Sequence, residues 1–125
     1  MKEFMLLIYN RIDAKSKLTE EKQLEFVNEC KLYIEDLQKE GKLISAQPFE
    51  KEGRIIRKIP KYWEEENIDD HEYKQVGYYH IYATDLEDAV NIAEKNPEFA
   101  FTTNASIYVR PIKTIEERNS FVYPR

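Results

Sequence analysis

The fold is decided by one stretch of sequence, Val76-Gly77-Tyr78-Tyr79-His80-Ile81-Tyr82-Ala83, which is followed at once by Thr84-Asp85-Leu86-Glu87-Asp88-Ala89. The first part has the composition of a buried strand, and the second has that of a capped helix start. Side chains alternate between the two faces of a strand. One face is therefore apolar and consists of Tyr79, Ile81 and Ala83. The opposite face is aromatic and titratable and consists of Tyr78, His80 and Tyr82, so a functional site is expected there.

The composition is that of one ordinary globular domain. The 125 residues are 42% hydrophobic and 34% charged, which is enough to bury a single core. We predict one domain over 1–125, with a core over about 3–113 and a polar tail over 114–125. The net charge of -5 disfavours non-specific nucleic-acid binding, because that binding needs basic side chains that neutralise phosphates.

The apolar run Phe4-Met5-Leu6-Leu7-Ile8-Tyr9 is too short to span a membrane, and no small-residue cleavage site follows it. We therefore expect a cytoplasmic protein that binds neither membrane nor nucleic acid. Cys30 is the only cysteine, so no internal disulfide or thiolate metal cluster is expected. Cys30 is interpreted as a small hydrophobe on a helix. His71 lies among acidic neighbours that cannot all reach one ion, so no metal or cofactor is predicted.

Hydrophobic periodicity predicts the elements that precede the opening stretch. Residues 3–10 form a strand that is apolar on both faces, as in a central strand. A long amphipathic helix follows, from an N-cap at Thr19 to a C-terminal stop at Gly41. Its apolar positions are Leu24, Val27, Tyr33, Ile34 and Leu37, with Phe26 and Cys30 beside them. Strands are then predicted over 42–49 and 54–59, the second at a sheet edge.

Residues 61–72 are predicted to be a polar loop, in which Trp63 is either a lid over a cleft or a plug at the sheet edge. A helix over about 86–95, with Asp85 or Thr84 as its N-cap, follows the opening stretch, and a last strand covers 105–112. This order predicts an α+β fold with a ferredoxin-like antiparallel sheet and two helices on one face. The other face is then uncovered and aromatic, so we expect a homodimer that presses two sheets together.

Four stretches, taken in their order and spacing, resemble the YCII-related family, whose neighbours include the DGPF-type proteins. They are Phe4-Met5-Leu6-Leu7-Ile8-Tyr9, Glu40-Gly41-Lys42-Leu43-Ile44-Ser45-Ala46-Gln47-Pro48, Gly77-Tyr78-Tyr79-His80-Ile81-Tyr82 with Asp85-Leu86-Glu87-Asp88-Ala89, and Ile107-Tyr108-Val109-Arg110-Pro111-Ile112. The resemblance implies a ferredoxin-like subunit that pairs into a dimeric α+β barrel. It also implies a cleft for a small molecule.

The chain departs from this family at the residues that the resemblance implies are catalytic. In the YCII-like branch these are a histidine on the first helix and an aspartate before the proline that ends the second helix. Here the corresponding positions hold Cys30 and Asn96. The DGPF-like motif falls at about residues 65–68 and is absent, although Gly77 and its neighbours are present. The family's reaction is therefore not expected to run here in the same way.

The candidate site residues all lie on the face that is predicted to be uncovered. His80 is suited to act as a general base, because histidine titrates near neutral pH. The candidates for ligand binding are Tyr9, Tyr78, Tyr82, Tyr108 and Arg110. Arg110 is able to hold a carboxylate or phosphate through two hydrogen bonds. The same residues also suit an interface, with His80 hydrogen-bonded and Arg110 ion-paired across a dimer.

Three functions follow from these patterns. The first is a YCII-like homodimer whose cleft binds a small, anionic organic molecule without an assigned reaction. The second is an enzyme that moves protons in an elimination, isomerisation or hydrolysis of a small organic acid. The third is a purely structural or interaction module.

Overall fold

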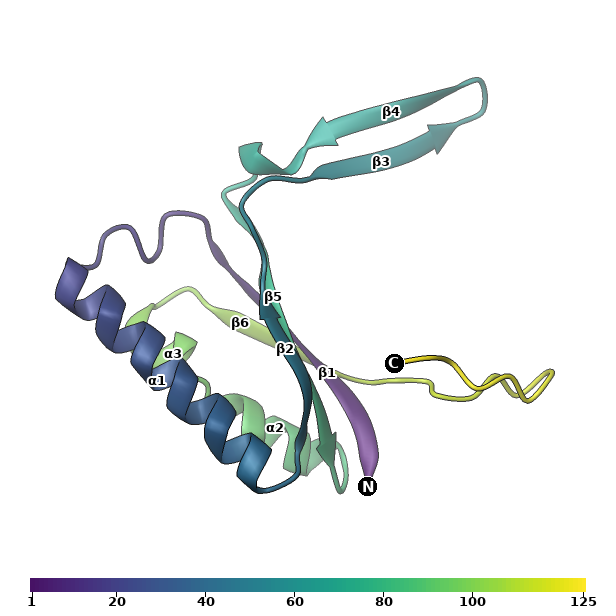
Figure 1. The fold of residues 1–125 in the computed structure, drawn as a ribbon. Coiled ribbons are helices and arrows are strands. Elements are labelled where there is room, and N and C mark those ends of the chain that lie inside the picture. Colours follow the sequence, from purple (N-terminus) through teal and green to yellow (C-terminus); the bar gives the residue numbers. More distant parts are fainter.

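A four-stranded antiparallel sheet with two helices on one face forms the body of the protein (Figure 1). The computed structural model describes all residues from 1 to 125. The sheet has the order β2-β5-β1-β6, and its strands are β1 (Lys2–Arg11), β2 (Leu43–Pro48), β5 (Tyr73–Ala83) and β6 (Ser106–Pro111). The covering helices are α1 (Glu20–Lys39) and α2 (Leu86–Glu94). The predicted α+β class and ferredoxin-like plan are confirmed.

The two central strands, β1 and β5, are paired over their whole length. Phe4 lies opposite Ile81, and Leu6 lies opposite Tyr79, with all four side chains buried. The register shifts at Ile8 and Tyr9, where β5 contains one extra residue, Val76. A bulge of this kind reverses which residues of the bulged strand point to each face. The central position predicted for the first strand is confirmed.

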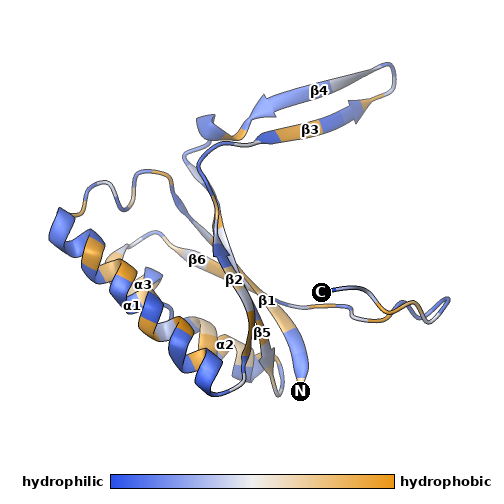
Figure 2. Ribbon diagram, in the orientation of Figure 1, coloured by the Kyte–Doolittle hydropathy of each residue, from blue (hydrophilic) through white to orange (hydrophobic).

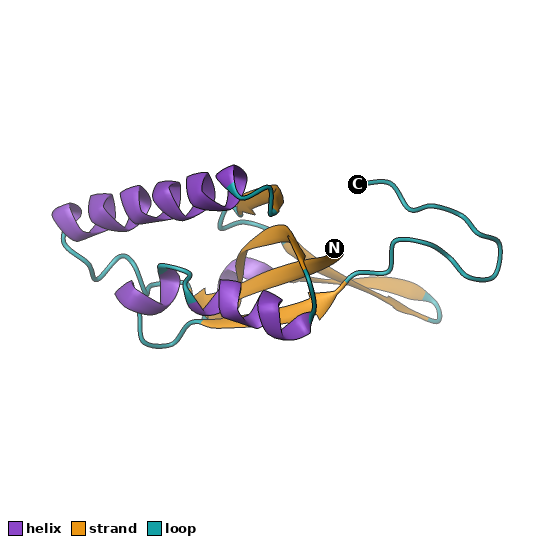
Figure 3. Ribbon diagram, turned by 90° about the horizontal axis from the view of Figure 1, so that it is seen from below, coloured by secondary structure: helices purple, strands orange, loops and turns teal.

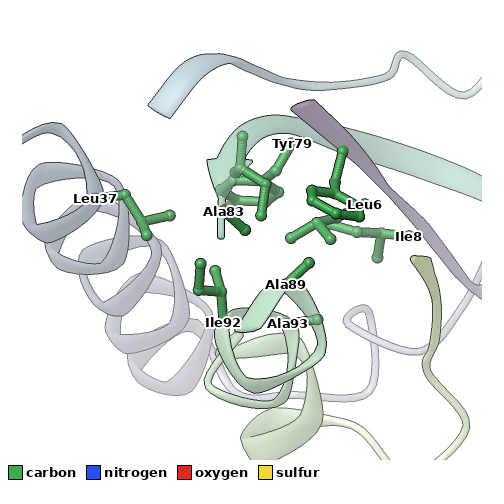
Figure 4. Packing of buried hydrophobic residues seen from close by; sticks show 10 residues of the cluster. Leu6, Ile8, Leu37, Tyr79, Ala83, Ala89, Ile92 and Ala93 are labelled. Carbon is green, nitrogen blue, oxygen red and sulfur yellow. The ribbon is translucent and has the colours of Figure 1, made fainter. Parts of the chain in front are cut away.

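The hydrophobic core lies between this sheet and the two helices. It contains ten buried residues: Phe4, Leu6, Ile8, Leu37, Tyr79, Ile81, Ala83, Ala89, Ile92 and Ala93. Figure 4 shows the labelled side chains from β1, β5, α1 and α2 pointing toward one another. The apolar face predicted for the opening stretch, Tyr79, Ile81 and Ala83, is therefore the face that the helices cover.

The helix ends confirm the predicted caps. The Thr19 side chain accepts a hydrogen bond from the Lys22 backbone N–H at 3.1 Å. Gly41 has a φ of 69°, which favours glycine. The Asp85 carboxylate accepts from the Asp88 backbone N–H at 2.8 Å and caps α2. Both helices therefore begin and end close to where the sequence places them.

The apolar face predicted for α1 is partly wrong. Leu24 and Val27 are mostly exposed, and Leu37 is the only buried residue of this helix. The inward line instead runs through Phe26, Cys30, Tyr33 and Leu37. The N-terminal half of α1 lies over a cavity, described below, and so lacks the close packing of its C-terminal half.

The strand predicted over 54–59 is present, but it does not lie at an edge of the four-stranded sheet, and the polar loop predicted over 61–72 is corrected. Strand β3 (Arg54–Ile59) pairs only with a strand that the sequence did not predict, β4 (Tyr62–Asn67). Arg57 lies 3.4 Å from Glu64 and 3.1 Å from Glu66, so the acidic run is paired across the hairpin. Trp63 is 61% exposed on β4 and therefore neither plugs the sheet edge nor covers a cleft.

Three short segments complete the chain. A 3-10 turn, η1 (Ile68–Asp70), follows β4, and a single helical turn, α3 (Glu98–Phe101), follows α2. The C-terminal tail, residues 113–125, leaves β6, forms a bridge between Ile115 and Val122, and returns to the sheet (Figure 1). None of the helices is long and apolar enough to cross a membrane.

Candidate functional site

The open face, which we define as the face of the four-stranded sheet that the helices do not cover, carries all the predicted site residues. On β1, Met5 lies opposite both His80 and Arg110, and Leu7 lies opposite both Tyr78 and Tyr108. Cα partners in an antiparallel pair share a face. The alternation of the opening stretch therefore brings Tyr9, Tyr78, His80, Tyr82, Tyr108 and Arg110 onto one surface. Their roles in catalysis or binding remain predictions.

Several of these residues already have partners within the chain. The hydroxyls of Tyr78 and Ser45 are hydrogen-bonded at 2.9 Å. The rings of Tyr9 and Tyr108 pack with their centroids 4.7 Å apart. Arg110 has no ion pair within the chain and is exposed. The open face thus presents an aromatic surface with one free cationic group.

His80 lies in a three-residue polar cluster with Glu3 and Arg125. Glu3 Oε1 accepts a hydrogen bond from His80 Nε2 at 2.8 Å, and Glu3 Oε2 lies 2.8 Å from Arg125 Nη2. The hydrogen bond from Arg125 lowers the pKa of the Glu3 carboxyl, and the bond from His80 adds to this effect against the opposing effect of burial. The Arg125 guanidinium also lies 5.7 Å from the centre of the Tyr82 ring. The cluster therefore anchors the C-terminal tail to the open face.

The helix-covered side of the sheet contains a cavity of about 260 Å³. It lies between α1, the strands β1, β2 and β5, and the segment that joins α2 to α3. Its apolar lining includes Ile8, Phe26, Val27, Ile34, Ala46 and Val76. Its polar lining includes Lys15, Cys30, Tyr79, Asn96 and Glu98. An apolar pocket with a few convergent polar groups is the usual form of a small-molecule site.

Glu98 is the centre of the polar network at this cavity. It is only 4% exposed, and its Oε1 lies 2.8 Å from Lys15 Nζ and accepts a hydrogen bond from Asn10 Nδ2, also at 2.8 Å. Asn10 Nδ2 lies a further 2.9 Å from the Thr102 hydroxyl. Lys15 also lies over the Phe26 ring, 4.6 Å from its centre. The charge of the buried carboxylate is thus balanced by Lys15 at the wall of the cavity.

Asn96 has an unsatisfied hydrogen-bond donor at the cavity wall. The residue is 3% exposed, and its Oδ1 accepts a hydrogen bond from the Glu98 backbone N–H at 2.9 Å. Its Nδ2 is buried and has no hydrogen-bond partner. The neighbouring Tyr79 hydroxyl is close enough for the amide to affect its pKa, but the pair does not reach hydrogen-bond geometry. A buried donor without an acceptor costs about 1–3 kcal/mol.

Two titratable groups of the lining, the Cys30 thiol and the Tyr79 hydroxyl, are protonated at neutral pH. Burial raises the pKa of the Cys30 thiol to about 11, and the nearby Glu98 charge raises it further against the opposing effect of Lys15. Burial is also the largest cause that raises the pKa of the Tyr79 hydroxyl. A protonated thiol is a poor nucleophile. The cavity is therefore better suited to hold a molecule than to attack one, and the interpretation of Cys30 as an unreactive side chain agrees with this chemistry.

Sequence reasoning missed most of this cavity. Asn10, Lys15 and Glu98 come from a strand end, a loop and the residue after Pro97, and no spacing in the chain connects them. Cys30 and Asn96 are different, because the family resemblance singles out both of their positions. Both of them line the cavity. The resemblance marked these two positions as departures from a catalytic pair, and no site was predicted on this side of the sheet.

No protein-family model matches the sequence. No curated protein is significantly similar to it either.

Replacing Glu98 with Gln is expected to lower the free energy of unfolding by about 2 kcal/mol, because Lys15 loses the charge that balances it at a partly buried position. Urea denaturation measures the change. Glu25→Gln is the matched control, since Glu25 pairs with Lys22 at an exposed position 3.1 Å away and should cost no more than about 0.5 kcal/mol. Equal costs for the two variants would contradict the structural role of Glu98.

Replacing Arg125 with Ala is expected to raise the pKa of Glu3 toward the ordinary value near 4.5, because the group that stabilises the charged carboxylate is removed. The lowered pKa means that the Glu3–Arg125 attachment is intact above the ordinary value and is lost as the pH falls through the lowered one. Carbon-13 NMR of the Glu3 carboxyl measures this titration. Arg118→Ala, in the same tail, should leave the curve unchanged. If the Glu3 titration in Arg125→Ala is the same as in the native protein, Arg125 does not attach the tail to Glu3.

Proposed function

We propose that the protein binds a small organic molecule in the cavity between α1 and the sheet. The observation that carries this proposal is the Asn96 side chain, which is almost fully buried and has a donor without a partner at the cavity wall. Buried polar groups in folded proteins nearly always have a partner. A ligand with a hydrogen-bond acceptor would supply the missing one and would remove the cost of leaving it unpaired.

The lining favours a compact, mainly apolar ligand with a carbonyl or similar acceptor oxygen. The cavity volume of about 260 Å³ equals the liquid volume of about nine water molecules at roughly 30 Å³ each. Lys15 and Glu98 neutralise one another at 2.8 Å, so the wall adds no net charge from this pair. The lining donors that we propose for the acceptor oxygen are the Tyr79 hydroxyl and the Asn96 amide, whose buried Nδ2 would turn toward the cavity. The anionic ligand predicted at Arg110 would instead bind on the open face.

We further propose that the chain is a member of the YCII-related group that has kept a cleft and lost the family's reaction. The ferredoxin-like plan and the positions of Cys30 and Asn96 at one cavity support this assignment. An amide does not titrate near neutral pH, and the Cys30 thiol, with a pKa of about 11, stays protonated. The two positions therefore provide no acid–base pair for proton transfer.

A thermal-shift screen tests the binding proposal. The probes are small aliphatic and aromatic ketones, amides and carboxylic acids. A ligand at 100 times its Kd should stabilise the native protein by about 2.7 kcal/mol and raise its Tm accordingly. Two variants should abolish the shift. Asn96→Asp keeps the acceptor for Glu98 but removes the free donor, and Ala46→Leu fills part of the cavity.

His80→Ala and Arg110→Ala serve as the controls for the open face. Both should keep the ligand-induced shift, because neither residue lines the cavity. A shift that is lost in Arg110→Ala and kept in Ala46→Leu would place binding on the open face and would overturn the proposed site. A native protein that no probe stabilises would also count against it.

We propose in addition that two copies of the chain associate through the open face. The support is its half-exposed apolar and aromatic surface on the central strand, from Met5, Leu7 and Tyr9, together with Tyr108, which is 55% exposed. An aromatic sheet face of this kind is usually covered. Arg110, which is free in the single chain, would then have a partner available across the interface.

Sedimentation velocity should therefore give a particle of twice the 15.0 kDa of one chain. Tyr108→Glu should shift the particle to the mass of one chain, because it places a charge within an apolar contact. Leu86→Glu is the matched control, since Leu86 is 50% exposed at the start of α2, on the helix side. A native protein that sediments as a monomer would exclude this interface.

A further inference from the structure

Two segments project from the body of the protein toward the side of the open face. One is the β3–β4 hairpin, and the other is the C-terminal tail, residues 113–125. Figure 1 shows both of them extending away from the helices, the hairpin near one end of the sheet and the tail near the other. Figure 3 shows again that the tail extends well beyond the helices and the sheet. Any partner on the open face would lie between these two segments.

The hairpin has no packing of its own to stabilise it. None of its residues is buried, and Ile56 and Trp63 are each 61% exposed. Figure 2 shows apolar residues along β3 in this projecting position. An isolated two-stranded hairpin is at best marginally stable in water. Arg54 and Arg57 pair with the three glutamates of β4, and Lys58 lies over the Trp63 ring, 4.9 Å from its centre. The outer surface of Trp63 and the Ile56 side chain are the apolar parts that remain exposed.

The tail is ordered by its own backbone but also exposes apolar side chains. Its turn is closed by hydrogen bonds from the backbone N–H of Glu116 to the carbonyl of Phe121 and from that of Tyr123 to Thr114, each at 2.8 Å. Ile115, Phe121 and Val122 are all more than half exposed. Lys113 pairs with Glu116 at 3.1 Å, so the charge here is also balanced within the segment.

We propose that the hairpin and the tail are two arms that hold a second copy of this chain against the open face. The proposal rests on the dimer proposed above and specifies what completes it. The tail is continuous with that interface, because Arg125 is bound to Glu3 and lies over Tyr82 on the open face itself. In a two-fold symmetric dimer each copy contacts the two arms of the other. The apolar side chains of the arms are therefore buried in both copies.

Internal charge balance favours a second copy over a charged partner. A partner recognised by electrostatics would need a cluster of unpaired like charges on the arms. The charges without an ion pair are Lys58 and Lys61 on the hairpin, with Lys58 over the Trp63 ring, and the opposite charges of Glu117 and Arg118 on the tail, whereas exposed apolar side chains are present on both arms. Apolar cores with few charges are typical of interfaces between identical subunits. The two arms therefore match a self-associating surface.

The test compares the dimer Kd of three variants with that of the native chain by analytical ultracentrifugation. Trp63→Ser changes the hairpin, and Phe121→Ser changes the tail. Leu24→Ser is the matched control, because Leu24 is 62% exposed on α1, away from both arms. Each arm variant should raise the Kd at least about tenfold, as loss of an interface aromatic commonly does. Leu24→Ser should leave it within about twofold of the native value.

Hydrogen exchange gives an independent readout on the native chain. The amides of β3, β4 and the tail turn should be protected above the Kd and should lose that protection on dilution below it. If both arm variants keep the native dimer Kd, or if Leu24→Ser weakens the dimer equally, the proposed role of the arms is wrong. The open-face dimer would still be supported in that case. A native monomer would overturn both. Ligand binding in the cavity is measured separately and depends on neither result.

Discussion

The antiparallel register between β1 and β5 is the constraint on which the rest of the structure depends. A shift of one residue would send Ile81 into solvent and His80 into the core, since side chains alternate with a period of two. The bulge at Val76 interrupts this alternation once and changes which face the neighbouring residues occupy. Val76 itself lines the cavity. Gln75 and Tyr73 lie on the open face, where Tyr73 stacks on Tyr9 with ring centroids 6.2 Å apart. One pairing thus builds the core, the cavity wall and the aromatic surface.

Sequence patterns predicted the elements whose stability is local or whose burial is strong. Thr19, Gly41 and Asp85 carry their helix-end signals in their own side chains or backbone, and the run in β1 is apolar on both faces. Strand β4 carried no such signal, because its three consecutive glutamates look like a solvated loop when read alone. They become a strand only when Arg54 and Arg57 pair with them from β3. Cross-strand charge pairing is a property of the pair, so one strand's sequence does not reveal it.

The two faces of the sheet also differed in how far the sequence predicted them. Alternation alone places Tyr78, His80 and Tyr82 together, so the open face was predictable from one strand. The cavity wall depends on contacts between distant parts of the chain, namely Asn10 with Glu98, Asn10 with Thr102 and Lys15 with Glu98. Its central group, Glu98, is held by Asn10 across 88 residues of sequence. Nothing in the local pattern around Pro97 distinguishes a buried carboxylate from an ordinary acidic helix start. The resemblance drew attention to Cys30 and Asn96, but as departures from a catalytic pair and not as the wall of a cavity.

The distribution of exposed apolar residues is the observation that supports the proposed association of two chains. Only sixteen of the 125 residues are buried, and ten of these make up the core. The accessible surface of 9166 Å² exceeds the roughly 7,000 Å² expected for a compact monomer of 15.0 kDa. Many of the remaining apolar side chains are grouped on two kinds of surface. Apart from single exposed residues on the helices, such as Leu24, Leu32 and Leu86, they lie on the open face and on the two arms. A ligand in the cavity would provide the acceptor that the Asn96 donor lacks. A ligand that fits about 260 Å³ is too small to cover the arms as well. Burial of the arms requires a macromolecular surface, and the open face between them is the part of the chain best placed to receive it.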